Sequence, residues 1–375
     1  RLLHRFPEVS GYEANTQKLL CEQLDELGIP YRKLDNNGII ATIAGTAPGA
    51  YDADGTPVRC VALRADMDAL PVAEQTGLPF ASENPGVMHA CGHDAHMAMM
   101  LGAVRILRDA ADSLAGEVRI IFQPAEEGVR GAQSIAEGGI LDDVDYLLTG
   151  HLGMGWNTGS LVALSKGFLS TTKVDAEFKG VSAHAGMSPQ DGKNAILAAC
   201  SATLAMHTAC QDSRGASRIN VGTIQGGSGR NVVPADAMIR FETRGETADI
   251  QELVLKKAMN AVNGAAEMFD CSVDTKIMGS ASSADSSAEL EPFIRAGAAR
   301  VPEITNYVKE AAFSRSEDAT YLMAKVQSHG RKAAYMCIGS NIAAPHHNDH
   351  FNFDESSLLT GLRLYVSTVW EIMHR

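Results

Sequence analysis

The sequence predicts an α/β protein in which a helix-covered mixed sheet is interrupted by a small inserted domain. Three observations support this prediction. Helical and strand-like segments alternate in the first part of the chain, a middle segment has the order β-α-β-β-α-β, and the alternation resumes from Ser286. Alternation of this kind is typical of an open sheet with helices on its faces, and the middle order is typical of a ferredoxin-like unit.

Hydrophobic periodicity defines the segments of the first part. Residues 15–27 have apolar side chains at helical spacing, and Gly28 follows as a helix stop. Short apolar runs predict strands, and a longer apolar run predicts a buried helix. Strands are expected at 60–63, 117–122 and 145–148, and further helices at 97–107 and 132–137.

The middle segment has a different pattern. Residues 172–178 alternate as a half-buried strand should, and residues 195–209 are an Ala-rich helical stretch. Three more strands are expected at 219–224, 237–243 and 271–277, with a second helix at 250–268. These segments predict a larger domain of residues 1–167 with 280–375, and an inserted domain of residues 168–279.

Composition limits the classes of partner and the compartment. The formal net charge of -13 would repel phosphate groups, so we exclude nucleic acids and anionic membrane surfaces as partners. No apolar run approaches the roughly 20 residues that span a bilayer. The seven cysteines are widely spaced and contain no CxxC pair, which favours a reducing cytoplasm over a disulfide framework or a zinc knuckle. Because the sequence opens with Arg1 rather than Met, it does not exclude a targeting segment that has been removed.

The densest group of reactive side chains is Met-His-Ala-Cys-Gly-His-Asp-Ala-His at residues 88–96. Cys91 and His93 can both face one metal ion if the chain turns between them, and Gly92 makes such a turn cheap. The alternative is a loop before a helix, with Asp94 as its cap and incidental histidines. By comparison with known ligand spacings, the motif favours a metal site.

A second group is Phe-Gln-Pro-Ala-Glu-Glu-Gly at residues 122–128, directly after a strand. Adjacent carboxylates repel each other, so Glu126 and Glu127 need either solvent or a cation. Taken alone, they would be two solvated glutamates in an exposed loop. In the chemical alternative, one of them binds a metal ion and its neighbour accepts a proton from metal-bound water.

Two further histidine positions lie near the ends of strands or helices. His151 follows the strand at 145–148, at the carboxyl edge where open α/β sheets place their sites. His346 and His347 lie side by side in the loop before the last helix, and residue type alone does not decide between them. Each could singly be a loop residue, but several clusters of metal-binding residue types at strand ends together predict a metal site.

Carboxylates near other element ends have two interpretations. Asp66 and Asp68 end a strand, where they either cap it or orient a histidine ligand by accepting its second N–H group. Glu317 and Asp318 precede the expected helix 319–326, so they are first an N-terminal cap and only second site residues.

The inserted domain also contains polar residues in its loops. His184 lies in the segment Ser-Ala-His-Ala-Gly, Arg230 and Asn231 follow the Gly-rich turn, and Arg244 ends a strand. On their residue types alone, these would be a loop histidine, a turn residue and surface arginines.

In this order, the motifs resemble the co-catalytic metallo-aminoacylase and carboxypeptidase superfamily. They fit its amidohydrolase branch, which includes hippurate hydrolase and the indole-acetyl amino acid hydrolases. The resemblance spans nearly the whole chain, and the pair Cys-Gly-His-Asp and Pro-Ala-Glu-Glu is its most specific part. The motifs that carry it lie at residues 64–70, 88–96, 122–128, 182–186, 229–234 and 346–348.

The resemblance implies that the larger domain is catalytic and binds two divalent metal ions, manganese first and zinc as the alternative. Glu126 would be the general base. His347 is preferred over His346 because branch members place the ligand directly before a small polar residue. The implied metal ligands are Cys91, His93, Glu127, His151 and His347.

The resemblance also implies that the inserted domain is a lid or dimerisation domain. His184 would reach the site of a partner subunit and stabilise the oxyanion, and Asn231, Arg230 and Arg244 would contact the substrate. The partner would be a second copy of the chain, or a homologous B subunit in a heterodimer.

The implied reaction is metal-dependent hydrolysis of the amide bond of an N-acyl amino acid. The first expectation is p-aminobenzoyl-glutamate, which would give p-aminobenzoate and glutamate. The alternative is a general N-acyl amino acid or dipeptide amidohydrolase, with hippurate-like or indole-acetyl-amino-acid-like substrates. A non-catalytic, ligand-binding partner subunit would be expected to lack ligands or base, whereas every position is filled here. A redox role for Cys91 would need a resolving cysteine nearby, and none is close in sequence.

Overall fold

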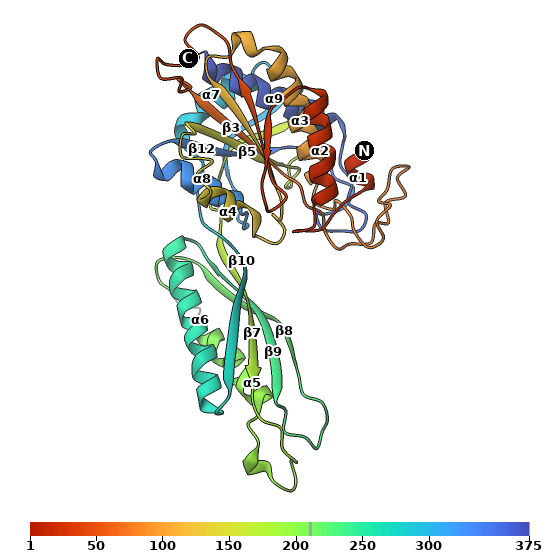
Figure 1. Ribbon diagram of the computed structural model, residues 1–375, viewed down its shortest axis with the longest axis vertical. Helices are drawn as coiled ribbons and strands as arrows, with labels where there is room; N and C mark the ends of the chain where they lie inside the picture. The colour runs from red at the N-terminus through yellow and green to blue at the C-terminus, as the bar shows by residue number, and fades with distance from the viewer. Residues whose placement is uncertain (210–211, 375) are drawn as a thin grey trace. The chain divides into compact units, whose positions relative to one another are not determined.

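The computed structural model describes residues 1–209 and 212–374 and contains two compact units (Figure 1). The first unit comprises Arg1–Gly167, Ala284–Phe313 and Asp318–Arg375, and the second comprises Phe168–Ser283 and Ser314–Glu317. One unit is built on a mixed sheet and the other on a four-stranded sheet in the order β-α-β-β-α-β. The predicted fold class is therefore confirmed.

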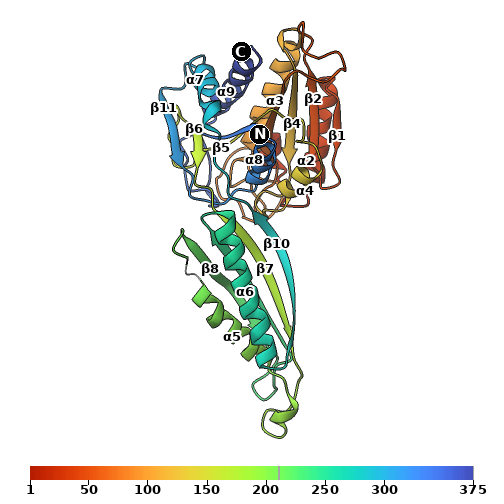
Figure 2. The ribbon, with the colours of Figure 1, turned by 90° about the vertical axis from the view of Figure 1, so that its left-hand side faces the viewer.

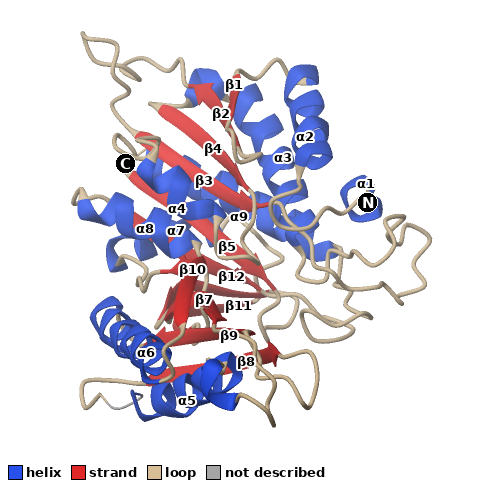
Figure 3. Ribbon diagram, turned by 60° about the horizontal axis from the view of Figure 1, so that its bottom comes forward, coloured by secondary structure: helices blue, strands red, loops and turns tan. Residues whose placement is uncertain are grey.

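The sheet of the first unit has eight strands in the order β1-β2-β4-β3-β5-β12-β6-β11. Figure 3 labels all of them except β6. Its centre is parallel, because β4, β3, β5 and β12 pair in the same direction. β1 and β2 are antiparallel to their neighbours, and β6 is antiparallel to β12 but parallel to the edge strand β11. The strands are β1 (Tyr31–Lys33), β2 (Ile39–Ala44), β3 (Cys60–Asp66), β4 (Glu117–Gln123), β5 (Tyr146–Leu152), β6 (Ser160–Lys166), β11 (Asn306–Ala312) and β12 (Lys332–Ile338).

Helices cover both faces of this sheet. Side chains of α2, α3, α7 and α9 share one apolar core with the strands, and α4 packs against α8. Central parallel strands that are covered on both sides must be largely apolar, which explains why every residue of β3 is buried. The helices are α1 (Leu2–Arg5), α2 (Ala14–Glu26), α3 (His93–Asp109), α4 (Gly131–Glu137), α7 (Glu291–Ala298), α8 (Ala319–Ser328) and α9 (Ser356–Met373).

The second unit is an antiparallel sheet in the order β10-β7-β9-β8, with α5 and α6 packed on it through a separate apolar core. Figure 2 shows α6 running along the sheet. Both helices begin at a side-chain cap, since Asn194 accepts from the Leu197 N–H and Thr247 accepts from the Ile250 N–H. The elements are β7 (Ser170–Lys179), α5 (Ala195–Met206), β8 (Ser217–Gly226), β9 (Asp236–Gly245), α6 (Ala248–Met268) and β10 (Ser272–Ala281).

The described cysteines carry free thiols, and Cys210 lies outside the described residues. Among the described helices, none combines the length and hydrophobicity that a membrane-spanning segment needs.

Candidate metal centre

The predicted site residues of the first unit gather at one edge of its sheet. The strands β4, β3, β5 and β12 are parallel, so their carboxyl ends meet at this edge. After β3, the chain passes through α3 to β4, which lies on one side of β3, whereas β5 lies on the other side. Open α/β sheets bind ligands at such a switch point, where neighbouring connections run in opposite directions. His151 was expected after its strand, but β5 continues to Leu152 because β12 pairs with it that far. His151 therefore lies within the strand.

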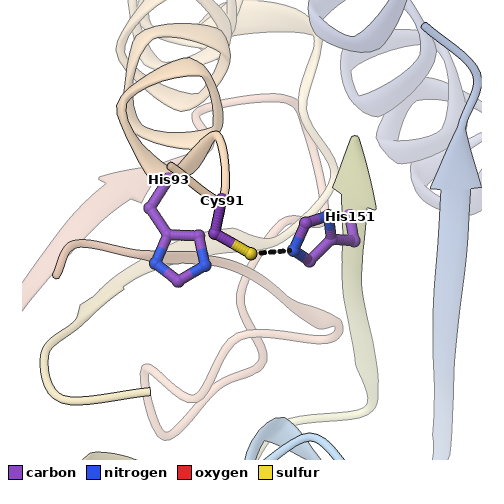
Figure 4. A group of neighbouring side chains, drawn as sticks. All are labelled: Cys91, His93 and His151. Carbon is purple, nitrogen blue, oxygen red and sulfur yellow. Dashed lines mark hydrogen bonds between the residues drawn. The ribbon is translucent and has the colours of Figure 1, made fainter. Parts of the chain in front are cut away.

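Cys91, His93 and His151 form one compact group (Figure 4). Their ligand atoms all lie within 4.8 Å of one another, and Cys91 Sγ is 3.4 Å from His151 Nε2. Gly92 has a φ of 88°, so the predicted turn between Cys91 and His93 is present and α3 begins directly after it. All three side chains are buried, which leaves each donor atom without bulk water.

Backbone carbonyls orient the rings of the two candidate ligand histidines. His93 Nδ1 is 2.9 Å from the carbonyl oxygen of Asp68, and His151 Nδ1 is 2.8 Å from that of Leu152. A carbonyl oxygen only accepts, so each Nδ1 carries the hydrogen and each Nε2 keeps a lone pair. His93 Nε2 makes no hydrogen bond within the described part of the chain. Both histidines are thus oriented so that Nε2 is the atom that can bind a cation.

A second group contains Cys91, Glu127 and His347. His347 Nε2 lies 3.4 Å from Glu127 Oε1, and the same oxygen is 3.9 Å from His93 Nε2. His346 instead places its Nε2 3.1 Å from the Leu152 carbonyl oxygen. The structure therefore brings His347, rather than its neighbour, to Cys91 and Glu127. Because both groups contain Cys91, its sulfur lies between two sets of donors.

The electrostatics of these groups suit a cation. Burial raises the pKa of the Cys91 thiol well above its usual value, and the charge of Glu127 adds to this effect. Burial lowers the pKa of His93, but Asp66 and Asp68 outweigh it and hold that pKa above its usual value. Positive charge is therefore stabilised beside His93. A divalent cation at this point would favour the thiolate form of Cys91, because a bound metal deprotonates its ligands. The donor set fits a metal ion.

Burial also keeps His151 neutral. It lowers the pKa of this imidazole well below its usual value, and His96 and His346 lower it further. Since a metal ligand must have an unprotonated nitrogen, this neutral form is the one that binding requires.

Asp68 connects the candidate ligand His93 to the two glutamates. Its Oδ1 accepts the Glu126 N–H at 3.0 Å and its Oδ2 accepts the Glu127 N–H at 2.9 Å, while its backbone oxygen accepts from His93. Ser10 donates its hydroxyl to the same carboxylate at 2.6 Å. The Asp68 carboxylate thus fixes the turn that contains Glu126, the expected base.

Asp66 belongs to a buried network that contains residues to which the sequence analysis gave no role. Arg64 donates to Asp66 Oδ2 at 2.8 Å and to the side-chain oxygen of Gln123 at 2.8 Å. His96 Nδ1 lies 2.6 Å from Asp66 Oδ1, and His96 Nε2 accepts the Leu152 N–H at 2.9 Å. The network therefore connects a buried arginine to the strand end that holds His151. The spacing of His93 and His96 by three positions, which puts both on one helix face, could have indicated it.

The predicted cap at the start of α8 is wrong in its contacts. Asp318 occupies the N-cap position, but its side chain makes no cap hydrogen bond. It accepts instead from Gln123 and from the Ala132 N–H, at 2.7 and 3.0 Å. A cap hydrogen bond is worth about 1 kcal/mol, and charged contacts in a buried network offset its loss.

In the second unit, the structure brings together only some of the predicted residues. His184 pairs with Val232 in an isolated bridge, and the carbonyl of Asn231 accepts the Ala185 N–H at 3.0 Å. Arg230 and Asn231 are exposed and precede β9, whereas Arg244 lies at the opposite end of that strand. Arg244 forms an ion pair with Glu242 at 2.9 Å.

A mixed α/β sheet that gathers a buried thiol, imidazoles and carboxylates at its carboxyl edge offers the donor types that metal-dependent hydrolases use. Residues 62–371 match the family described as Peptidase family M20/M25/M40, and the chain belongs to this family. It is thus a metallohydrolase that acts on amide bonds.

Individual relatives support the assignment. The chain is 46% identical to indole-3-acetyl-aspartic acid hydrolase of Enterobacter agglomerans, over 88% of this chain and 76% of that protein. It is 44% identical to one of the subunits of p-aminobenzoyl-glutamate hydrolase of Escherichia coli, over the same shares. The crystal structure of an aminobenzoyl-glutamate utilization protein from Klebsiella pneumoniae superposes with a TM-score of 0.82 at 33% identity, covering 98% of this chain and 93% of that one.

Proposed function

We propose that the chain hydrolyses the amide bond of N-acyl amino acids with the help of two divalent cations, manganese in the first place. The observation that carries the proposal is the pair of donor groups that share Cys91. One group adds His93 and His151, and the other adds Glu127 and His347. Mixed thiolate, imidazole and carboxylate donors suit both manganese and zinc. Turnover after adding each metal separately to the metal-free protein distinguishes the two.

Glu126 is the proposed general base. Bound cations would supply Lewis acidity, which acidifies water and polarises a carbonyl group. Glu126 accepts the proton of the attacking water and delivers it to the amine nitrogen as the C–N bond breaks. Asp68 holds the Glu126 backbone in place for both transfers. His184 of a partner subunit would donate a hydrogen bond to the oxyanion.

The proposed substrates are conjugates of acidic amino acids, with p-aminobenzoyl-glutamate first. Two relatives support this choice, since their names give an indole-3-acetyl conjugate of aspartic acid and a p-aminobenzoyl conjugate of glutamate. A broader specificity for N-acyl amino acids is the second candidate, because the acyl groups of these two relatives differ. The Escherichia coli relative is named as one subunit of its hydrolase, which supports assembly with a homologous B subunit as an alternative to a homodimer.

Glu126→Gln separates catalysis from metal binding. The variant should retain the metal content of the wild type but lose roughly 10²–10⁴-fold in turnover of p-aminobenzoyl-glutamate, since the amide cannot accept the proton. Elemental analysis and release of p-aminobenzoate measure the two properties. Glu137→Gln is the matched control, because Glu137 is exposed at the end of α4. Normal turnover by Glu126→Gln would show that Glu126 is not the general base. Active protein without stoichiometric metal would contradict the whole mechanism.

A further inference from the structure

The turn that contains the proposed base also holds an arginine in a defined place. The Arg130 N–H donates to the Ala125 carbonyl at 3.1 Å, and the Val129 N–H donates to the Glu126 carbonyl at 2.6 Å. These hydrogen bonds close the turn between β4 and α4. Because Asp68 fixes the Glu126 and Glu127 amides of the same turn, the backbone of Arg130 is positioned relative to the candidate metal centre.

The Arg130 side chain folds back over Gly128, the residue directly after Glu127. A β-carbon on Gly128 would lie only 2.5 Å from Arg130 Nε and 2.9 Å from its Nη2. The absence of a side chain on Gly128 therefore allows the guanidinium to lie against this part of the turn. The guanidinium therefore lies against Gly128, the residue that directly follows the candidate ligand Glu127 in the chain.

The charge of Arg130 is exposed and not neutralised by the protein. Within residues 1–209 and 212–374, its guanidinium makes no hydrogen bond or ion pair. Many other arginines of the first unit do pair with a carboxylate, as Arg5 does with Glu83 and Arg300 with Glu371. An unpaired arginine in the turn that follows Glu126 and Glu127, in a chain of net charge -13, is available to an anionic ligand.

We propose that Arg130 is a specificity-determining residue that binds the side-chain carboxylate of the amino acid released from the substrate. This inference rests on the proposed function. A glutamate side chain reaches its carboxylate within about four bonds of roughly 1.5 Å from the scissile nitrogen, so the contact needs a cation close to the reacting groups. Asp66, Asp68 and Glu126 would otherwise repel a dicarboxylate. The planar guanidinium can hold a carboxylate bidentately, which an ammonium group cannot match.

The test compares two substrates that differ only in charge, p-aminobenzoyl-glutamate and p-aminobenzoyl-glutamine. For Arg130→Ala, kcat/KM on the glutamate conjugate should fall about 10- to 100-fold, the range for loss of a charge-assisted hydrogen bond. On the glutamine conjugate, it should change by less than about 3-fold. Arg130→Lys should recover part of the loss. Calorimetric titration of the metal-free protein with the glutamate conjugate should show the same order of affinities.

Arg105→Ala is the matched control. Arg105 is exposed on α3 and lies twelve residues after His93, about 18 Å along the helix. Its replacement should change the turnover of neither substrate. Equal losses on both conjugates, or no loss on either, would overturn the role of Arg130. If the wild type cleaves neither conjugate nor any other N-acyl amino acid with manganese or zinc added, the proposed function itself fails.

Discussion

Replacing His96 by phenylalanine tests whether the network behind the metal centre stabilises the fold and the site. The substitution keeps an aromatic ring at a position where His96 stacks on His93 and meets His151 edge-on. It removes two hydrogen bonds at once, the one from His96 Nδ1 to Asp66 and the one from the Leu152 N–H to His96 Nε2. Both partners are buried and would be left with no water to replace the lost bonds.

The size of the effect follows from these two bonds. A buried amide without an acceptor costs about 1–3 kcal/mol, and a hydrogen bond to a charged group is worth about 1.5–3 kcal/mol. Arg64 still pairs with Asp66, so the carboxylate is not left alone. We therefore expect the free energy of unfolding to fall by about 3–5 kcal/mol. Since the Leu152 carbonyl also fixes His151, metal affinity should fall by about 10- to 100-fold.

Urea unfolding of the metal-free protein measures the first quantity, and competition with a chromogenic chelator measures the second. His96→Gln is the matched variant, because an amide can donate to Asp66 and accept from the Leu152 N–H as the imidazole does. It should recover about half of the lost stability. If His96→Phe unfolds at the wild-type urea concentration and binds metal as tightly, the network has no supporting role.

Two further predictions concern stability. Burial lowers the pKa of His4, but Asp94 outweighs this and raises it to about 9, from an ordinary value of 6.5. The contact between His4 and Asp94 should therefore add up to about 3 kcal/mol to the free energy of unfolding below pH 6.5, and this contribution should disappear as the pH rises through 9. Urea unfolding at several pH values measures this dependence, which should be absent in His4→Gln. Gly131→Ala would place a β-carbon 1.7 Å from the Pro124 carbonyl oxygen, so it should cost about 1–3 kcal/mol in thermal or urea unfolding and lower turnover. Gly264→Ala is the control, because a β-carbon at this position of α6 would have no neighbour within 4 Å. It should raise the free energy of unfolding by about 0.5–1 kcal/mol. Equal effects of Gly131→Ala and Gly264→Ala on stability would contradict the packing argument.

The sequence predicted those features that are local in the chain. The parallel core and the β-α-β-β-α-β unit follow from periodicity, and β3, α3 and β4 all contain their predicted segments. No strand was assigned at β1, β2, β6, β11 or β12. β1 and β11 are partly exposed edge strands with little periodicity of their own. The mostly buried runs of β2, β6 and β12 do not alternate in a way that marks a strand. The end of β5 was placed too early for a related reason, since pairing with β12 extends the strand over polar and glycine residues.

Contacts between distant segments could not be read from the sequence. The motifs named the residues of both donor groups, but the sharing of Cys91 depends on how three loops converge. His4 and Glu13 lie near the start of the chain, and they contact Asp94 and the Ala125 N–H across the fold. No spacing rule relates residues so far apart in the chain, so the sequence analysis could not predict these contacts of His4 and Glu13.

Backbone carbonyl groups order the two candidate ligand histidines, His93 and His151. β3 pairs with β5 only as far as Leu63, and beyond that point His96 takes up the Leu152 N–H that a neighbouring strand would otherwise use. The carbonyls of Asp68 and Leu152 then set the rings of His93 and His151. Because these contacts belong to the sheet and its loops, the fold itself orients the Nε2 atoms of both rings toward the donor group. Binding would therefore cost little side-chain entropy, and the cation adds charge to a geometry that the fold already provides.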